Sequence, residues 1–144
     1  MASESIYESR LNQALAVCKS QISPKYQKIL EGFVECYKEA LGSSFAQAIP
    51  HLLLFLELVE PYFQSPFHFE PYHQKIRHPI DYYQFGMDFI RPLIDLPQSK
   101  IFGKEHLDTI LLALKRNENC ILLANHQTEG DPQAISILLE QEYS

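Results

Sequence analysis

Two apolar stripes at helical spacing, separated by helix-breaking residues, constrain the fold of this chain more than any other feature. In residues 4–22 and again in residues 25–41, apolar side chains recur every three or four positions, which places them on one face of a helix. Ser23 and Pro24 stand between the two stripes, and Gly42 follows the second. Serine and proline are frequent at helix starts and glycine at helix ends. We therefore predict two helices joined by a short turn.

A third segment begins at Ser43 or Ser44, continues to about Glu60 and is apolar nearly all round. A helix of this kind is usually the buried member of a bundle. Pro50 lies inside it, and because proline cannot donate a backbone hydrogen bond, we expect a kink or a restart there. Residues 1–65 are thus predicted to form an antiparallel helical bundle with short connections.

The character of the sequence changes after the bundle. Residues 61–79 hold four prolines and five aromatic residues, which indicates an irregular connection. A short helix is predicted over residues 81–90. Residues 91–97 are expected to be extended or turn-like, because residues that precede proline avoid the helical region.

The last third of the chain predicts helix, strand, loop and helix. A helical stripe covers residues 104–116, and four apolar residues at 121–124 are consistent with a buried strand. A polar loop at 125–130 leads to a last helix over about residues 131–141, and this order is the opening of an α/β unit. A lone strand has no partner for its backbone groups. We therefore predict an α/β fold class, mostly helical here, in which residues 66–144 are the connection and the incomplete start of an α/β domain in a truncated chain.

Composition and charge argue against several classes of function. The formal net charge of −6 opposes non-specific binding to nucleic acid, which requires a basic surface. Leu52–Leu56, which no other apolar run exceeds in length, is far shorter than the roughly 20 residues of a membrane-spanning helix. We expect no transmembrane segment, although transient contact with a membrane stays open. The N-terminal residues match neither a secretory signal nor a transit peptide, so a cytoplasmic protein is expected.

The three cysteines, Cys18, Cys36 and Cys120, are odd in number and include no Cys-x-x-Cys pair. Each lies in or beside an apolar face or run. We therefore expect buried free thiols in a reducing compartment, rather than disulfides or metal ligands.

One polar segment could carry chemistry. His126 follows the predicted strand, and Asp131 stands at the predicted N-cap of the last helix. A tight loop could bring the two side chains together, and an aspartate that holds one ring nitrogen of a histidine presents the other as a base. Such a base suits an alcohol that attacks a thioester. Each residue alone has a simpler interpretation, because Asp-Pro is a common helix cap and a loop histidine is usually a surface residue.

The surrounding sequence is more specific. Residues 125–132, Asn-His-Gln-Thr-Glu-Gly-Asp-Pro, resemble the first acyltransferase block of the soluble, plastid-type glycerol-3-phosphate acyltransferases. The segments His-Pro-Ile-Asp-Tyr-Tyr-Gln-Phe-Gly (78–86) and Phe-Ile-Arg-Pro-Leu-Ile-Asp (89–95) are similar to the stretch that these enzymes carry before that block. The resemblance covers about residues 77–136, and the N-terminal helices fit only in general character. Gly130 is a departure, because the family usually has alanine there.

The resemblance implies transfer of a fatty acyl group from acyl-carrier protein or acyl-CoA to the 1-hydroxyl of glycerol 3-phosphate. His126 would be the general base, and Asp131 would orient it and stabilise its charged form. No cofactor or metal is implied. The phosphate ligands are expected in later blocks that this chain lacks, so the chain alone should be inactive. Its location would be the cytoplasm or, as a mature protein, the plastid stroma.

Other interpretations stay open. The chain could be a non-catalytic helical interaction module in which His126 and Asp131 are only loop and cap. It could also be a hydrolase or metal-dependent enzyme with His126, Glu129 and Asp131 as ligands. His73, Arg77 and His78 match no metal-site spacing and indicate a surface loop. A basic middle segment could dock an acidic carrier protein or be only a solvated surface, and its members are Lys75, Arg77, Arg91, Lys100 and Lys104.

Overall fold

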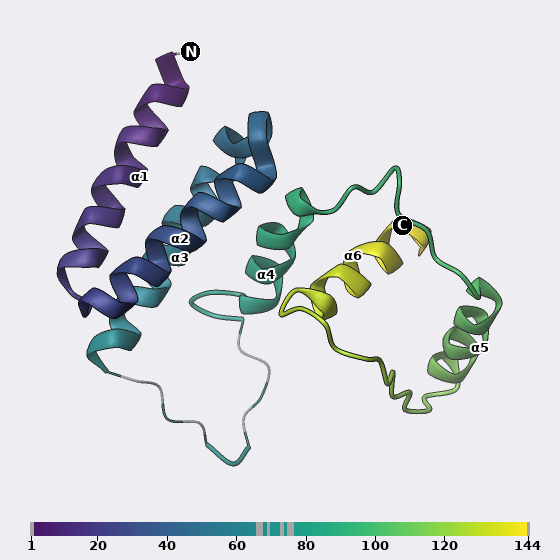
Figure 1. Ribbon diagram of the computed structural model, residues 1–144. Coiled ribbons are helices and arrows are strands. Elements are labelled where there is room, and N and C mark those ends of the chain that lie inside the picture. Colours follow the sequence, from purple (N-terminus) through teal and green to yellow (C-terminus); the bar gives the residue numbers. More distant parts are fainter. Residues whose placement is uncertain (1, 66–67, 69, 73, 75–76, 144) are drawn as a thin grey trace. The chain divides into compact units, whose positions relative to one another are not determined.

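All regular elements in this computed structural model are helical within the described residues, which are 2–65, 68, 70–72, 74 and 77–143 (Figure 1). The α-helices are α1 (Ala2–Ser20), α2 (Pro24–Leu41), α3 (Phe45–Gln64), α4 (Tyr82–Ile90), α5 (Lys104–Lys115) and α6 (Asp131–Tyr143). Two 3₁₀ helices, η1 (Gly42–Ser44) and η2 (Arg91–Leu93), follow α2 and α4. The six helices predicted from the sequence are confirmed, with small shifts at their ends.

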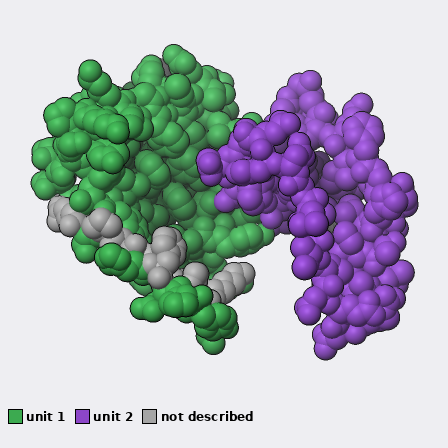
Figure 2. All heavy atoms as spheres, turned by 60° about the horizontal axis from the view of Figure 1, so that its bottom comes forward, with its two compact units in different colours: residues 1–93 green, residues 94–144 purple. Residues whose placement is uncertain are grey.

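The chain divides into two compact units, Met1–Leu93 and Ile94–Ser144, which Figure 2 colours separately. The first unit holds α1 to α4, and the second holds α5 and α6. The predicted bundle, residues 1–65, lies within the first unit, to which the structure adds α4. The candidate catalytic loop lies wholly within the second unit.

The first unit is built around α3. This helix contacts α1, α2 and α4, and α1, α2 and α3 run alternately in opposite directions (Figure 1). Ala48, Ile49, Leu52 and Leu56 of α3 are almost fully buried. Their spacing of one, three and four residues places them on one face of the helix. The prediction that the most apolar helix is the buried one is thereby confirmed.

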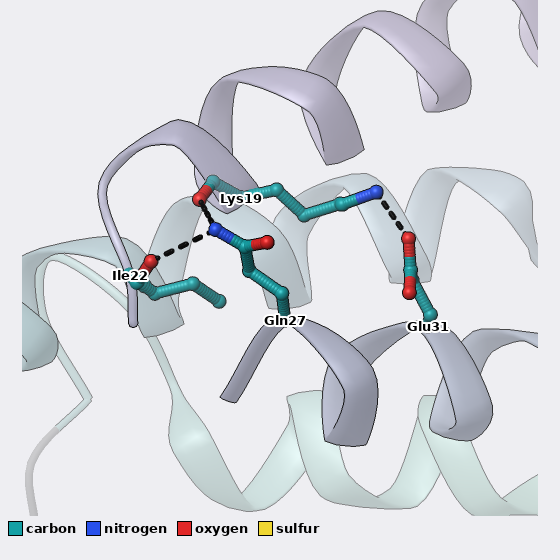
Figure 3. Close-up of polar contacts among 4 residues, drawn as sticks. All are labelled: Lys19, Ile22, Gln27 and Glu31. Carbon is teal, nitrogen blue, oxygen red and sulfur yellow. Dashed lines mark hydrogen bonds and ion pairs between the residues drawn. The ribbon is translucent and has the colours of Figure 1, made fainter. Parts of the chain in front are cut away.

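A glutamine side chain closes the turn between α1 and α2 (Figure 3). Nε2 of Gln27 donates to the carbonyl of Lys19 at 2.9 Å and to that of Ile22 at 3.1 Å. These carbonyls lie at and just beyond the end of α1, where helical N–H donors run out, and that of Lys19 also accepts the backbone N–H of Ile22 at 3.3 Å. The ammonium of Lys19 also pairs with Glu31 of α2. Two side-chain contacts therefore join the ends of these antiparallel helices.

Gly42 reverses the chain between α2 and α3. Its φ of 50° lies in the region that favours glycine. By length and composition alone, one helical stretch among the described residues, Pro24–Phe63, could cross a membrane. It comprises α2, η1 and most of α3, folds back at Gly42 and supplies most of the buried core of the first unit. The expectation of no transmembrane segment stays a prediction.

A buried hydroxyl and a cluster of rings hold α4 on the bundle. Tyr37 of α2 donates its hydroxyl proton to the carbonyl of Phe89 at 2.7 Å. The ring centroid of Phe89 lies 4.6 Å from that of Tyr37, and three further rings lie within 6.0 Å of it, those of Phe33, Phe55 and Phe85. Offset and tilted ring pairs of this kind add to the stabilisation from burial. This anchor explains why the first unit continues past the predicted bundle to include α4.

The strand predicted over residues 121–124 is not formed. Residues 118–127 have no regular secondary structure, and the described part of the chain contains no strand. Ile121 and Leu123 are 84 % and 90 % exposed. A strand satisfies its backbone groups through a neighbouring strand, and the described residues supply none. The α/β fold class is thus borne out only in its helical part.

Two details of the predicted helices are also corrected. A kink or a restart was predicted at Pro50; α3 continues through Pro50 and Pro61, so the restart does not occur, and the kink stays a prediction. Burial of Ile49 and Leu52 on either side stabilises the helix, although proline removes one backbone hydrogen bond. Residues 91–97 were predicted to be extended or turn-like, but the first three of them form the 3₁₀ helix η2.

The three cysteines are free, but only one of them is buried. Cys18 lies in the core, as predicted, and burial raises the pKa of its thiol. Cys36 is exposed because the buried stripe of α2 runs through Val34 and Tyr37 and leaves Cys36 outside it. Cys120 is exposed because it adjoins residues 121–124, which do not form the predicted strand and are themselves exposed. The prediction of buried thiols is therefore wrong for Cys36 and Cys120.

Replacing Tyr37→Phe should destabilise the first unit by about 1–2 kcal/mol, because the buried carbonyl of Phe89 loses its donor. The free energy of unfolding in urea measures this loss. Burial raises the pKa of Tyr37 from 10.0 to about 12, so the folded state keeps this proton at a pH where the unfolded chain releases it. Stability should therefore fall as the pH rises from 10 to 12, and the variant should lack this part of the fall.

Tyr26→Phe is the matched control, since Tyr26 is 45 % exposed on the same helix. Its stability should stay within about 0.5 kcal/mol of the wild type. Equal urea midpoints for Tyr37→Phe and the wild type would show that the hydroxyl does not hold α4 on α2.

Candidate functional site

The loop that carries His126 begins at the C-terminus of α5, where two backbone hydrogen bonds end the helix. The backbone N–H of Asn117 donates to the carbonyl of Leu114, and that of Glu118 donates to the carbonyl of Ala113, both at 3.0 Å. This pair of bonds is the Schellman motif, and Asn117 occupies its left-handed position with a φ of 62°. The motif turns the chain out of α5 into the segment that leads to His126.

The loop ends at the start of α6. The carbonyl of Gly130 accepts the hydrogen bond of the Ala134 N–H at 2.9 Å, so Gly130 takes the N-cap place and Asp131 is the first residue of the helix. The sequence placed Asp131 itself at the N-cap, which is wrong by one residue. The carboxylate of Asp131 turns back toward the preceding loop and finds its hydrogen-bond donors there.

Three hydrogen-bond donors and the imidazole of His126 converge on this carboxylate. Oδ2 accepts from the backbone N–H of Gln127 at 2.6 Å and from that of Thr128 at 3.0 Å. Oδ1 accepts from the hydroxyl of Thr128 at 2.8 Å. Nδ1 of His126 lies 3.2 Å from Oδ2. The loop therefore folds around one negative charge.

These contacts lower the pKa of Asp131 to about 2. The largest cause is the backbone N–H of Thr128, followed by the backbone N–H of Gln127 and the Thr128 hydroxyl, and the charge of His126 contributes less. Hydrogen bonds donated to a carboxylate favour its ionised form. Asp131 therefore keeps its negative charge throughout the neutral and mildly acidic range.

The structure brings the two predicted catalytic side chains together. Asp131 meets Nδ1 of His126, which leaves Nε2 as the nitrogen that could act as a base. The imidazole is 59 % exposed, so a substrate hydroxyl can reach it from solvent. The arrangement can orient a histidine and stabilise its protonated form. The catalytic roles of the two residues stay a prediction.

The residues considered as metal ligands do not form a cluster. Within the described part of the chain, no group of three or more His, Cys, Asp or Glu side chains could hold a metal ion. Glu129 is exposed. His73 lies outside the described residues. Arg77 pairs with Asp81, the N-cap of α4, at 3.0 Å.

The basic middle segment is partly neutralised by neighbouring acids. Lys104 pairs with Glu142 at 2.5 Å within the second unit. Arg77 pairs with Asp81 within the first unit. Lys100 is exposed, and Lys75 lies outside the described residues. Ion pairs at an exposed surface reduce the field available to a partner. Docking of a carrier protein on this segment stays a prediction.

The sequence analysis missed Gln127 and Thr128, which donate three hydrogen bonds to the Asp131 carboxylate oxygens, two from backbone N–H groups and one from a hydroxyl. A signal for them exists in the sequence. Aspartate side chains commonly bond to backbone N–H groups a few residues away, in loops and turns as well as at helix caps. The spacing of Thr128 and Asp131 allows this contact, but it fits a helix cap equally well.

Comparison with known proteins relates the chain to plant acyltransferases. It is 38 % identical to the chloroplastic glycerol-3-phosphate acyltransferase of Spinacia oleracea in an alignment of 120 positions that covers 80 % of this chain. The corresponding protein of Arabidopsis thaliana is 36 % identical in an alignment of 104 positions that covers 72 % of this chain. That of Carthamus tinctorius is 33 % identical in an alignment of 128 positions that covers 81 % of this chain. No family model matches the chain.

The matched regions are longer than residues 77–136, so the similarity also includes part of the N-terminal helices. The chain spans only 21–27 % of the length of these three relatives. The resemblance seen in the sequence is confirmed at the level of the family. The chain is therefore homologous to the chloroplastic glycerol-3-phosphate acyltransferases of plants and corresponds to about a quarter of their length.

Proposed function

We propose that this chain carries the catalytic histidine and aspartate of a glycerol-3-phosphate 1-O-acyltransferase. The observation that carries the proposal is the 3.2 Å contact between Nδ1 of His126 and Oδ2 of Asp131. A histidine beside a carboxylate serves many reactions, so the contact alone does not identify a substrate. Homology to acyltransferases selects acyl transfer among those reactions.

In the proposed reaction, Nε2 of His126 accepts the proton of the 1-hydroxyl as its oxygen attacks the thioester carbonyl of acyl-acyl-carrier protein or acyl-CoA. The carbon–sulfur bond then breaks, and the leaving thiolate takes the proton from the imidazolium. Asp131 holds the Nδ1 side of the ring and stabilises its positive charge. Its low pKa supports this role, because the carboxylate remains charged when the imidazole is protonated.

Glycerol 3-phosphate and the acyl donor are the proposed partners, and no cofactor is required. The phosphate ligands would come from parts of a longer protein that this chain does not include, since its relatives are about four times as long. The relatives are named as chloroplastic proteins, so we place the complete protein in the plastid stroma.

Residues 121–124 are proposed to become a strand of an α/β domain when the rest of such a protein is present. Four consecutive apolar residues, two of them more than 80 % exposed, support this assignment. Such a segment gains both burial and backbone hydrogen bonds from a neighbouring strand.

The purified 144-residue chain should show no acyl transfer to glycerol 3-phosphate. The reason is that it lacks the segments expected to bind the phosphate and the acyl chain. A radiolabelled acyl-transfer assay checks this, with the spinach enzyme as the positive control. Turnover by the chain alone would contradict the proposed division of the active site.

The catalytic role can be tested in a chimera in which this chain replaces the homologous segment of the spinach enzyme. His126→Ala should lower kcat by about 10²–10⁴-fold, the usual contribution of a positioned base. His106→Ala is the matched control, because His106 is also an exposed histidine beside a carboxylate, 3.7 Å from Glu105. It should leave kcat unchanged. Full activity of His126→Ala would favour a non-catalytic helical module instead.

Hydrogen exchange tests the proposed strand in the same pair of proteins. The amides of residues 121–124 should exchange rapidly in the 144-residue chain, where they have no strand partner. They should be protected in the chimera, because strand pairing removes them from water. Equally rapid exchange in both proteins would rule out strand formation by this segment.

A further inference from the structure

One threonine bonds to both oxygens of the Asp131 carboxylate. The hydroxyl of Thr128 donates to Oδ1 at 2.8 Å, and its backbone N–H donates to Oδ2 at 3.0 Å. The backbone N–H of Gln127 and Nδ1 of His126 also meet Oδ2. Among the described residues, the Thr128 hydroxyl is therefore the donor to the oxygen that His126 does not contact.

A donor on each oxygen fixes the plane of the carboxylate. Rotation about the last side-chain bond of an aspartate is broad when nothing restrains it. This rotation moves both oxygens together, so the donors on Oδ2 restrain it from one side of the bond. The donor on Oδ1 restrains it from the other side, and any turn of the carboxylate then lengthens hydrogen bonds at both oxygens. The hydroxyl thereby helps to set the direction in which Oδ2 faces the imidazole.

We infer that Thr128 is a positioning residue that holds the Asp131 carboxylate in the plane required to orient His126. The effect of Thr128 on catalysis rests on the proposed function. Its effect on the orientation of the Asp131 carboxylate does not. Thr128 is exposed, so its methyl group contributes little to packing. Loss of the hydroxyl should therefore leave the helices intact and act only on the carboxylate.

The first test uses nuclear magnetic resonance on the 144-residue chain. The carboxyl carbon of Asp131 should titrate with a midpoint of about 2 in the wild type. Thr128→Val keeps the shape of the side chain but removes the hydroxyl, so the midpoint should rise. Overhauser contacts between the His126 ring and the Asp131 side chain should weaken. Thr128→Ser keeps the hydroxyl and should restore both wild-type readings.

The second test uses the chimera with the spinach enzyme. Thr128→Val should lower kcat about tenfold, which corresponds to one hydrogen bond to a charged group, with little change in KM for glycerol 3-phosphate. Thr128→Ser should recover the wild-type kcat. In an Asp131→Asn background, Thr128→Val should cause no further loss, because residues that act as one unit are not additive.

The outcomes separate this inference from the proposed function. An unchanged Asp131 midpoint and unchanged Overhauser contacts in Thr128→Val would overturn the positioning role, whether or not the chimera is active. A further loss in the Asp131→Asn background would also overturn it, because Thr128 would then act by another route. Wild-type kcat in His126→Ala refutes the proposed function, and the titration still decides the positioning. An inactive His126→Ala beside a fully active Thr128→Val refutes the positioning role alone.

Discussion

Burial of one face of α3 is the constraint on which the first unit depends. Ala48, Ile49, Leu52 and Leu56 have almost no exposed surface, and α1, α2 and α4 all pack against this helix. The hydrophobic gain from covering the face exceeds the local cost of proline within the helix, so α3 continues through Pro50. The turn that the Gln27 side chain closes and the turn at Gly42 bring α1 and α2 back alongside α3.

In the second unit, charge orders the loop that carries His126. α5 has no buried residue, and the apolar segment after it is exposed, so burial does little to order the loop between α5 and α6. The Asp131 carboxylate orders this loop instead, because it accepts three hydrogen bonds from Gln127 and Thr128. The same bonds that order the loop keep the carboxylate ionised beside His126. Local structure and the chemistry proposed for the site therefore share one cause.

Sequence reasoning located the six α-helices of the described residues, but it missed the two 3₁₀ helices and erred where a result depended on distant neighbours. The stripe of α2 and the signals at Ser23 and Gly42 act over a few residues, so they can be recognised without a structure. The strand at 121–124 was predicted from an apolar run, yet strand formation needs a partner that the described chain does not offer. The exposure of Cys36 likewise depends on which side of α2 contacts α3. The apolar stripe alone does not show whether a residue at its border is buried or exposed.

The sequence by itself determined the helices, the positions of His126 and Asp131 near one another along the chain, and the kinship with plant acyltransferases. These features follow from short-range periodicity and from the identity of residues within a few positions. Only the tertiary structure decided that α4 joins the bundle through Tyr37 and Phe89, and that Asp131 turns back into the loop rather than capping α6. The Tyr37 hydroxyl and the Asp131 carboxylate could each bond to several groups. Which bond forms depends on the donors and acceptors that the folded chain brings within hydrogen-bond distance.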